Sequence, residues 1–117
     1  MAIGVTTRHF SGGDDSWMGS RHAVANARTG TLNATAFTVE NGIVKSGTPV
    51  AEVDGLLVPF DGDGTGGTEV LAGFVIDDRD ITAGNEPCAV LWHGRIKTEN
   101  LPVEFTAPTG ASAFVFV

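Results

Sequence analysis

The sequence predicts a mostly β fold built of short strands, and three observations support that fold class. Glycine accounts for 16 of 117 residues, about twice its ~7% share of average proteins, and there is no tyrosine, a composition that disfavours long helices. Short apolar runs are separated by turn signals such as Asn41-Gly42 and Asp54-Gly55. No stretch has the 3.6-residue apolar period of an amphipathic helix.

The first 30 residues differ from the rest and are interpreted as an extended arm. They are rich in Gly, Ser, Thr, Asp and Arg, and their apolar residues follow neither a period of 2 nor one of 3.6. These apolar residues cannot make a core by themselves and need another surface. They are Ile3, Val5, Phe10, Trp17 and Met18. The expected organisation is an arm over residues 1–30 and a compact β-rich domain over residues 31–117.

Strand-like patterning begins at Thr31 and continues to the last residue. Strands are expected within 31–39, 43–45, 50–53, 56–60, 69–76, 89–93, 95–97 and 113–117. Pro59 places part of its strand at a sheet edge, because proline cannot donate to a β-ladder. Residues 61–68 and 77–87 are expected to be loops and turns, with one short helical turn near 98–101. The apolar C-terminal run is expected to dock as a strand, since free termini are usually polar.

Size and charge exclude several classes of function. A chain of 117 residues has room for one domain and one core, which argues against a two-domain enzyme. The net charge of −7 opposes binding to nucleic acid and to anionic membranes. The longest apolar run, Leu56 to Phe60, is far shorter than the ~20 residues of a membrane span. The N-terminus lacks the apolar segment of a signal peptide, so synthesis in a cytoplasm is expected.

The glycine-rich segment offers two candidate ligand-binding motifs, and each is incomplete. Gly62 to Gly67 satisfies G-x-G-x-x-G, but a dinucleotide site also needs a helix after the motif, and here a strand is expected. The carboxylates of Asp61 and Asp63 are spaced as in the first half of a calcium loop. The twelfth position, which requires a glutamate, is Ala72. A flexible loop is the favoured interpretation.

The remaining candidates also have simpler structural explanations. Asp77, Asp78 and Asp80 could supply a general acid and a base, but a solvated turn beside Arg79 is favoured. Cys88 precedes an apolar run and is expected to be an inert core thiol. The three histidines lack metal-ligand spacing, and no serine completes a nucleophile elbow. We therefore predict no catalytic, cofactor-binding or metal-binding residue, and a protein that is not an enzyme.

Six short segments, taken in order, carry a resemblance to a known group of proteins. The segments are Asp14-Asp15-Ser16-Trp17-Met18-Gly19-Ser20-Arg21-His22, Thr29 to Phe37, Ser46-Gly47-Thr48-Pro49-Val50, Ala72-Gly73-Phe74, Leu91-Trp92-His93-Gly94 and Leu101-Pro102-Val103. Together they span nearly the whole chain. Each is short, but the ordered series resembles the head decoration proteins of tailed bacteriophages. A more distant similarity extends to the head decoration protein of phage lambda.

This resemblance implies a fold, an assembly and a role. The fold is a mostly β domain of β-clip type, and the assembly is a homotrimer. Such trimers sit at local three-fold axes on the outer surface of an expanded icosahedral capsid and act as cement in the virion. Their arms are implied to pair with a strand of the major capsid protein. No cofactor, nucleic acid or membrane is implied as a partner.

The residues independently suit these expectations. An unpatterned arm with spaced apolar residues suits β-augmentation, in which backbone hydrogen bonds give affinity. The predicted capsid-binding residues are Val5, Phe10, Trp17 and Met18, with Phe10 or Trp17 as an anchor in a pocket of the partner. In the alternative, Trp17 folds back onto its own domain. Apolar residues in nearly every segment of so small a domain leave surface for a three-fold interface to cover.

The function expected from the sequence is therefore capsid stabilisation. A head under internal DNA pressure must resist separation of its subunits, and a protein that bridges several subunits adds binding energy that is lost if they part. Two alternatives remain. One is a β-module of a phage tail or baseplate, and the other is a small enzyme with a β-clip core, such as a nucleotide hydrolase.

Overall fold

The computed structural model describes residues 14–19, 27–108 and 113–117. Within them the chain is mostly β, which confirms the predicted class of short strands. The strands are β1 (Arg28–Leu32), β2 (Ile43–Val44), β3 (Pro49–Val53), β4 (Leu56–Pro59), β5 (Gly73–Val75), β6 (Arg79–Asp80), β7 (Glu86–Leu91), β8 (Gly94–Ile96) and β9 (Phe114–Phe116). Two 3-10 turns, η3 (Glu40–Gly42) and η4 (Thr98–Asn100), complete the described elements.

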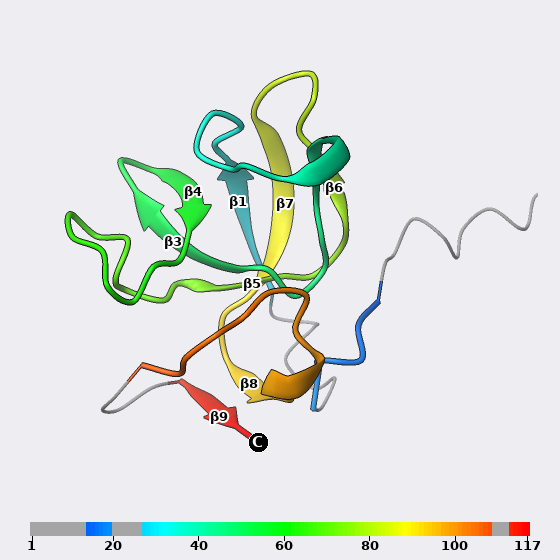
Figure 1. The fold of residues 1–117 in the computed structure, drawn as a ribbon, viewed down its shortest axis with the longest axis vertical. Coiled ribbons are helices and arrows are strands. Elements are labelled where there is room, and N and C mark those ends of the chain that lie inside the picture. Colours follow the sequence, from blue (N-terminus) through cyan, green and yellow to red (C-terminus); the bar gives the residue numbers. More distant parts are fainter. Residues whose placement is uncertain (1–13, 20–26, 109–112) are drawn as a thin grey trace, which may run out of the picture.

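Five strands form a closed barrel in the order β1-β4-β3-β5-β7 (Figure 1). Strand β7 pairs with β1 along five register positions and closes the barrel. Within the barrel, all pairings are antiparallel except that of β1 with β4, which is parallel and rests on Leu32 opposite Leu57. Two small sheets lie outside the barrel, antiparallel β2-β6 and parallel β8-β9.

Side chains alternate across the barrel wall and supply two cores. One face of β5 and β7 contributes Val75, Cys88 and Val90 to the barrel interior. The other buried residues of that interior come from the remaining barrel strands, from β2 and from loops. They are Leu32, Phe37, Val44, Val50, Leu57 and Ile81. The opposite face of the same two strands presents Phe74 and Leu91, which pair with each other across the ladder.

Phe74 and Leu91 belong to a second core, which we call the Trp17 cluster. Its buried members are Trp17, Met18, Phe74, Leu91, Ile96 and Phe114. It fills the space between the outside of the barrel and the small β8-β9 sheet, which lies below the barrel in Figure 1. Met18 forms an isolated antiparallel bridge with Ile96, so the segment 17–19 lies alongside β8.

Local turn chemistry predicted several elements correctly. Asp54 and Gly55 both have positive φ angles (54° and 83°), as a two-residue turn of type I′ between β3 and β4 requires. The apolar C-terminal run is docked as expected, because β9 pairs with β8. The short helical turn expected near residues 98–101 is η4.

Other expectations need correction. Strand β1 begins at Arg28, ahead of the predicted boundary at residue 31, and residues 14–19 pack against the domain. Residues 33–39 and 69–72, expected to contribute to strands, lie outside them. The charged turn after β5 contains a short strand, β6, because Ile43 and Val44 pair with it. Pro59 does not disrupt the pairing of β4 with β1. It is the last residue of β4 and lies beyond Leu57, the one position at which β4 pairs with β1.

Candidate functional site

The side chain of Trp17 is completely buried and is hydrogen-bonded to a distant turn. Its indole Nε1 donates to Oγ of Ser46 at 3.0 Å. The Ser46 hydroxyl donates in turn to the carbonyl oxygen of Ile76. The backbone N–H of Ser46 donates to Oδ1 of Asp78 at 2.7 Å. The indole, the serine turn and the segment after β5 are thus tied together by one chain of hydrogen bonds.

The turn beside Trp17 has room only for glycine. Gly47 has a φ of +94°, and a Cβ atom there would lie 2.8 Å from the indole atoms Cδ1 and Nε1 of Trp17 and 2.8 Å from Cδ of Pro102. The Phe74 ring lies on another side of the indole, with a centroid separation of 5.7 Å. Leu91 is buried in the same cluster.

Five of the six segments that carry the resemblance therefore meet around one indole. Trp17, the Ser46-Gly47 turn, Phe74, Leu91 and Pro102 come from positions spread over most of the chain. The remaining segment, 29–37, contributes Leu32 and Phe37 to the barrel core. These motifs thus build the interior of the domain.

Two predicted capsid-binding residues, Trp17 and Met18, lie inside this interior. Their exposed fractions are 0% and 8%, so neither side chain is open to a partner as the anchor prediction requires. The structure has the alternative arrangement, in which Trp17 packs onto its own domain. The other two predicted residues, Val5 and Phe10, lie outside the described residues.

Backbone hydrogen bonds explain why Trp17 is buried. Asp14 accepts the N–H of Ser16 at 2.9 Å, and the carbonyl of Asp15 accepts the N–H of Met18 at 3.0 Å, which turns the chain. The Trp17 carbonyl then accepts the N–H of Lys97 at 2.7 Å, beside β8. The Asp14-Asp15-Ser16 turn was the available sequence signal, but its partner strand is about 80 positions away, and local pattern analysis does not reach that far.

The acidic segment after β5 is engaged in turns and ion pairs. Arg79 lies 3.5 Å from Oδ2 of Asp77 and 3.6 Å from Oε2 of Glu86. Asp80 accepts hydrogen bonds from Oγ1 and from the backbone N–H of Thr82, at 2.6 and 2.8 Å. These bonds stabilise the ionised form and hold the pKa of Asp80 below its usual value. Such a carboxylate is a poor general acid.

The other candidate chemistry is similarly accounted for. Burial raises the pKa of the Cys88 thiol to about 11, so the reactive thiolate is scarce near neutrality. The Gly62–Gly67 motif lies in a series of turns that lead to β5, without the helix that a dinucleotide site requires. Ala72 donates its N–H to the carbonyl of Val50. Among the described residues, no group of three or more His, Cys, Asp or Glu is placed to hold a metal ion.

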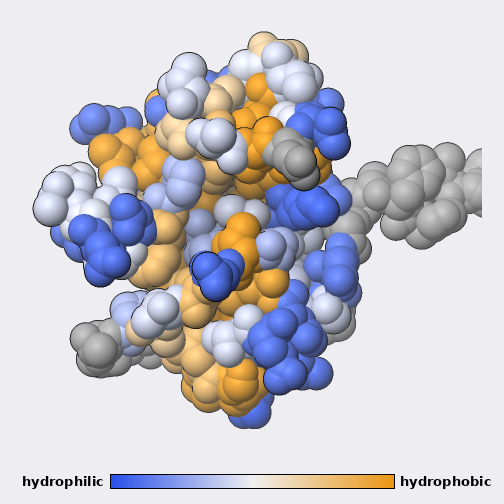
Figure 2. All heavy atoms as spheres, in the orientation of Figure 1, coloured by the Kyte–Doolittle hydropathy of each residue, from blue (hydrophilic) through white to orange (hydrophobic). Residues whose placement is uncertain are grey.

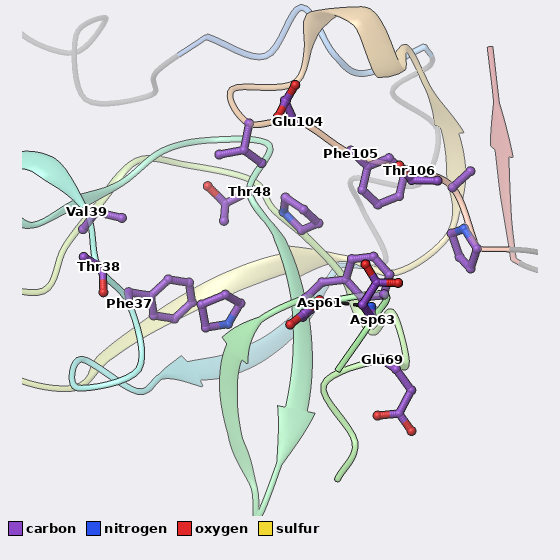
Figure 3. Close-up of a pocket in the computed structure, with 17 residues that line it drawn as sticks. Phe37, Thr38, Val39, Thr48, Asp61, Asp63, Glu69, Glu104, Phe105 and Thr106 are labelled. Atoms are coloured by element: carbon purple, nitrogen blue, oxygen red, sulfur yellow. Dashed lines mark hydrogen bonds between the residues drawn. The ribbon is translucent and has the colours of Figure 1, made fainter. Parts of the chain in front are cut away.

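The described surface contains a groove of about 930 Å³, which we call the acidic groove. Its walls carry the rings of Phe37, Phe60 and Phe105 and several prolines. Four carboxylates lie along it, from Asp61, Asp63, Glu69 and Glu104, and among the described residues neither lysine nor arginine lines it. Figure 3 shows Glu104 and Phe105 on one side and the acidic residues of the glycine-rich loop on the facing side.

A second hollow of about 590 Å³ adjoins the acidic groove, and the two share Val39 and Val103. Asp14, Lys45 and Asp78 contribute its charged groups. The two hollows together form a depression that is lined by six carboxylates and one lysine.

Apolar side chains are also exposed at strand β9 and just after its end. Val115 in β9 and Val117, the residue that follows β9, are 54% and 52% exposed. In an extended chain, residues two positions apart point to the same side. Figure 2 shows hydrophobic residues gathered at the lower end of the molecule, where Figure 1 places β8 and β9. This surface and the acidic groove are the candidate interaction sites of the described chain.

Comparisons with protein-family models, with curated protein sequences and with solved structures found no match. In the part of the chain that the structure describes, no helix has the length and apolar character needed to cross a membrane.

Proposed function

We propose that the protein is a non-enzymatic capsid decoration protein of a tailed bacteriophage. It binds as a homotrimer to the outside of an expanded head, at local three-fold sites, and stabilises the shell of major capsid protein against internal DNA pressure. The protein is synthesised in the host cytoplasm and ends in the virion. It needs no cofactor, because cementing a shell requires binding energy alone.

The observation that supports this proposal is the convergence of the resemblance segments on one interior. Short motifs such as Ser-Gly-Thr-Pro carry little information separately. In the structure these motifs meet around Trp17, which bonds to Ser46 and lies close to Gly47 and Pro102. They therefore share one structural role, which is to pack the same core. Segments that together specify one core are more informative about a shared fold than unrelated surface motifs are.

The trimer is supported by the exposed apolar side of β9. Val115 and Val117 present two branched apolar side chains beside a buried core. Contact with two further copies around a three-fold axis would remove this surface from water. The acidic charge of −7 per chain suits the solvated exterior of a head and disfavours contact with packaged DNA.

The test is addition of the purified protein to empty, expanded heads that lack their decoration protein, followed by sedimentation. Unexpanded heads of the same phage are the control. We expect saturable binding in multiples of three, to expanded heads alone, and a higher temperature of head rupture. Absence of binding to expanded heads would overturn the proposal. Binding to purified tails instead would favour a tail or baseplate module, and nucleotide turnover would favour an enzyme.

A further inference from the structure

The Asn41-Gly42 pair, which forms the η3 turn, also carries chemistry of its own. When glycine follows asparagine, the glycine nitrogen can attack the side-chain carbon Cγ of the asparagine, because glycine has no side chain to obstruct the approach. Five asparagines occur in the chain, and Asn41 alone is followed by glycine. The Asn41 side chain is also exposed. This pair is therefore the place in the chain where the attack is sterically easiest.

Hydrogen bonds hold the side chains of the other described asparagines. The side-chain oxygens of Asn33 and Asn85 accept backbone N–H groups at 3.1 and 2.9 Å. The side-chain nitrogen of Asn100 donates to a backbone carbonyl at 3.0 Å. In the described part of the chain, no hydrogen bond holds the side chain of Asn41. Its amide can therefore rotate toward the backbone, whereas the other three are restrained.

The folded turn keeps the two reacting atoms apart. Asn41 has a φ of 58° and a ψ of 14°. Ring closure requires the Gly42 nitrogen to eclipse Cβ of Asn41 about the Cα–C bond, and this ψ turns the nitrogen to the opposite side. The turn is also fastened to the segment after β6, where Ile81 donates its N–H to the Gly42 carbonyl at 2.8 Å. The reaction therefore requires this contact to open and the Asn41 backbone to rotate.

We propose that Asn41 is a site of spontaneous deamidation, which proceeds when the η3 turn opens locally. The Gly42 nitrogen bonds to Cγ and loses its proton, and the Cγ–Nδ2 bond breaks to release ammonia. Water then opens the resulting succinimide ring. Cleavage of the bond to Cγ gives aspartate, and cleavage of the bond to the main-chain carbonyl carbon gives isoaspartate. This reaction does not depend on a role in capsids.

Isoaspartate lengthens the backbone by one methylene and should disturb the pairing beside it. Ile43 follows Gly42 directly and lies opposite Asp80 in the β2-β6 sheet. The added methylene displaces the Gly42 carbonyl from the N–H of Ile81. Aspartate adds a negative charge, keeps the backbone length and tolerates a positive φ. The hydrogen bond to Ile81 should thus be lost in the isoaspartate form and kept in the aspartate form.

The test is incubation of the folded, full-length protein at mildly alkaline pH. Tandem mass spectrometry assigns the gain of one mass unit to individual asparagines. We expect Asn41 to react severalfold faster than Asn33, Asn85 and Asn100, and faster still in denaturant, which opens the turn. Equal rates at these asparagines in the folded protein would overturn the proposal. An Asn41 rate that denaturant leaves unchanged would overturn the requirement for opening.

A pair of variants tests the role of the turn in the folded state. Asp80 accepts two hydrogen bonds from Thr82 beside the contact that fastens η3, so Asp80→Ala should loosen this region and raise the Asn41 rate severalfold. The matched control is Asp61→Ala, which removes a similar bond to the N–H of Asp63 in the glycine-rich loop and should leave the rate unchanged. Equal Asn41 rates in the two folded variants would overturn the requirement for opening.

Amide hydrogen exchange at Ile81 tests the effect of the product. The isoaspartate form is isolated by chromatography from aged protein and compared with the variant Asn41→Asp, which carries the charge without the added methylene. We expect the Ile81 amide to exchange severalfold faster in the isoaspartate form. Equal exchange in the two samples would overturn the predicted loss of the bond to Gly42.

Discussion

The indole N–H of Trp17 and the hydroxyl of Ser46 are joined by a buried hydrogen bond of 3.0 Å across 29 positions of sequence. Both groups are almost inaccessible to solvent, with exposed fractions of 0% and 3%. A buried donor or acceptor that loses its partner costs roughly 1–3 kcal/mol, which exceeds the net gain from an ordinary hydrogen bond. The pair therefore makes this contact between the N-terminal region and the barrel specific.

Replacement of Trp17 should destabilise the free domain. Trp17→Ala removes the largest fully buried side chain, and such truncations cost about 3–5 kcal/mol. Trp17→Phe keeps a ring but leaves Ser46 without its donor, for a smaller loss of about 1–3 kcal/mol. Chemical denaturation measures both. Trp92→Phe is the control, because Trp92 is 37% exposed. An unchanged free energy of unfolding in Trp17→Ala would contradict the buried position of Trp17.

Gly47→Ala should be more harmful than Gly55→Ala. Both glycines have positive φ angles, so each substitution incurs a similar backbone strain of about 1–2 kcal/mol. A Cβ atom at Gly47 would also meet Trp17 and Pro102 at 2.8 Å, whereas nothing lies within 4 Å of one at Gly55. We expect the clash to add about 1–3 kcal/mol at Gly47. Equal unfolding midpoints for the two variants would show that the neighbours yield freely.

Stability should fall as the pH rises from about 9 to about 11, because of Cys88. Burial raises its pKa from the ordinary 9.0 to about 11 in the folded domain. Over this interval the unfolded chain releases the thiol proton while the folded chain retains it, so unfolding becomes more favourable. Below pH 9 the contribution is constant. Denaturation of the wild type and Cys88→Ala at several pH values should give curves that converge above pH 9, and parallel curves would contradict the assignment.

The exposed valines of β9 should control self-association. Val115→Lys with Val117→Lys places two charges on the surface that the proposed three-fold interface covers, which opposes its burial. We expect analytical ultracentrifugation at high concentration to show trimers for the wild type and monomers for the double variant. Val70→Lys, at another exposed valine, is the matched control. Trimers that persist in the double variant would place the interface elsewhere.

Local chemistry in the sequence was enough to predict most strands. The Asp54-Gly55 turn and the alternation around it define β3 and β4, because hairpin geometry depends on neighbouring residues. The apolar C-terminal run was likewise recognisable as a docked strand. In these cases the relevant interactions lie within a few residues or follow from hydrophobicity alone.

Contacts between distant segments could not be predicted in the same way. Nothing near Leu32 indicates that it faces Leu57 in a parallel pair and helps to close a barrel. The burial of Trp17 depends on the carbonyl of Arg95 and the N–H of Lys97, which hold segment 17–19 beside β8. A tryptophan in a polar stretch has the same local pattern whether it binds a partner or its own chain. The acidic groove is formed by loops whose proximity is visible only in three dimensions.

The Trp17 cluster can be completed only late in synthesis, because its members lie far apart in the sequence. Phe114 emerges from the ribosome 97 residues after Trp17, an interval of about 5–20 s at ~5–20 residues per second. All five barrel strands have been made by Leu91, so a nascent barrel can close while the outer face that bears Phe74 still lacks its cover. Until β8 and β9 have also been made, this apolar face is available to chaperones and to other nascent chains. Slow elongation between Leu91 and Phe114 would prolong that exposure, and overproduction would then favour aggregation through this face.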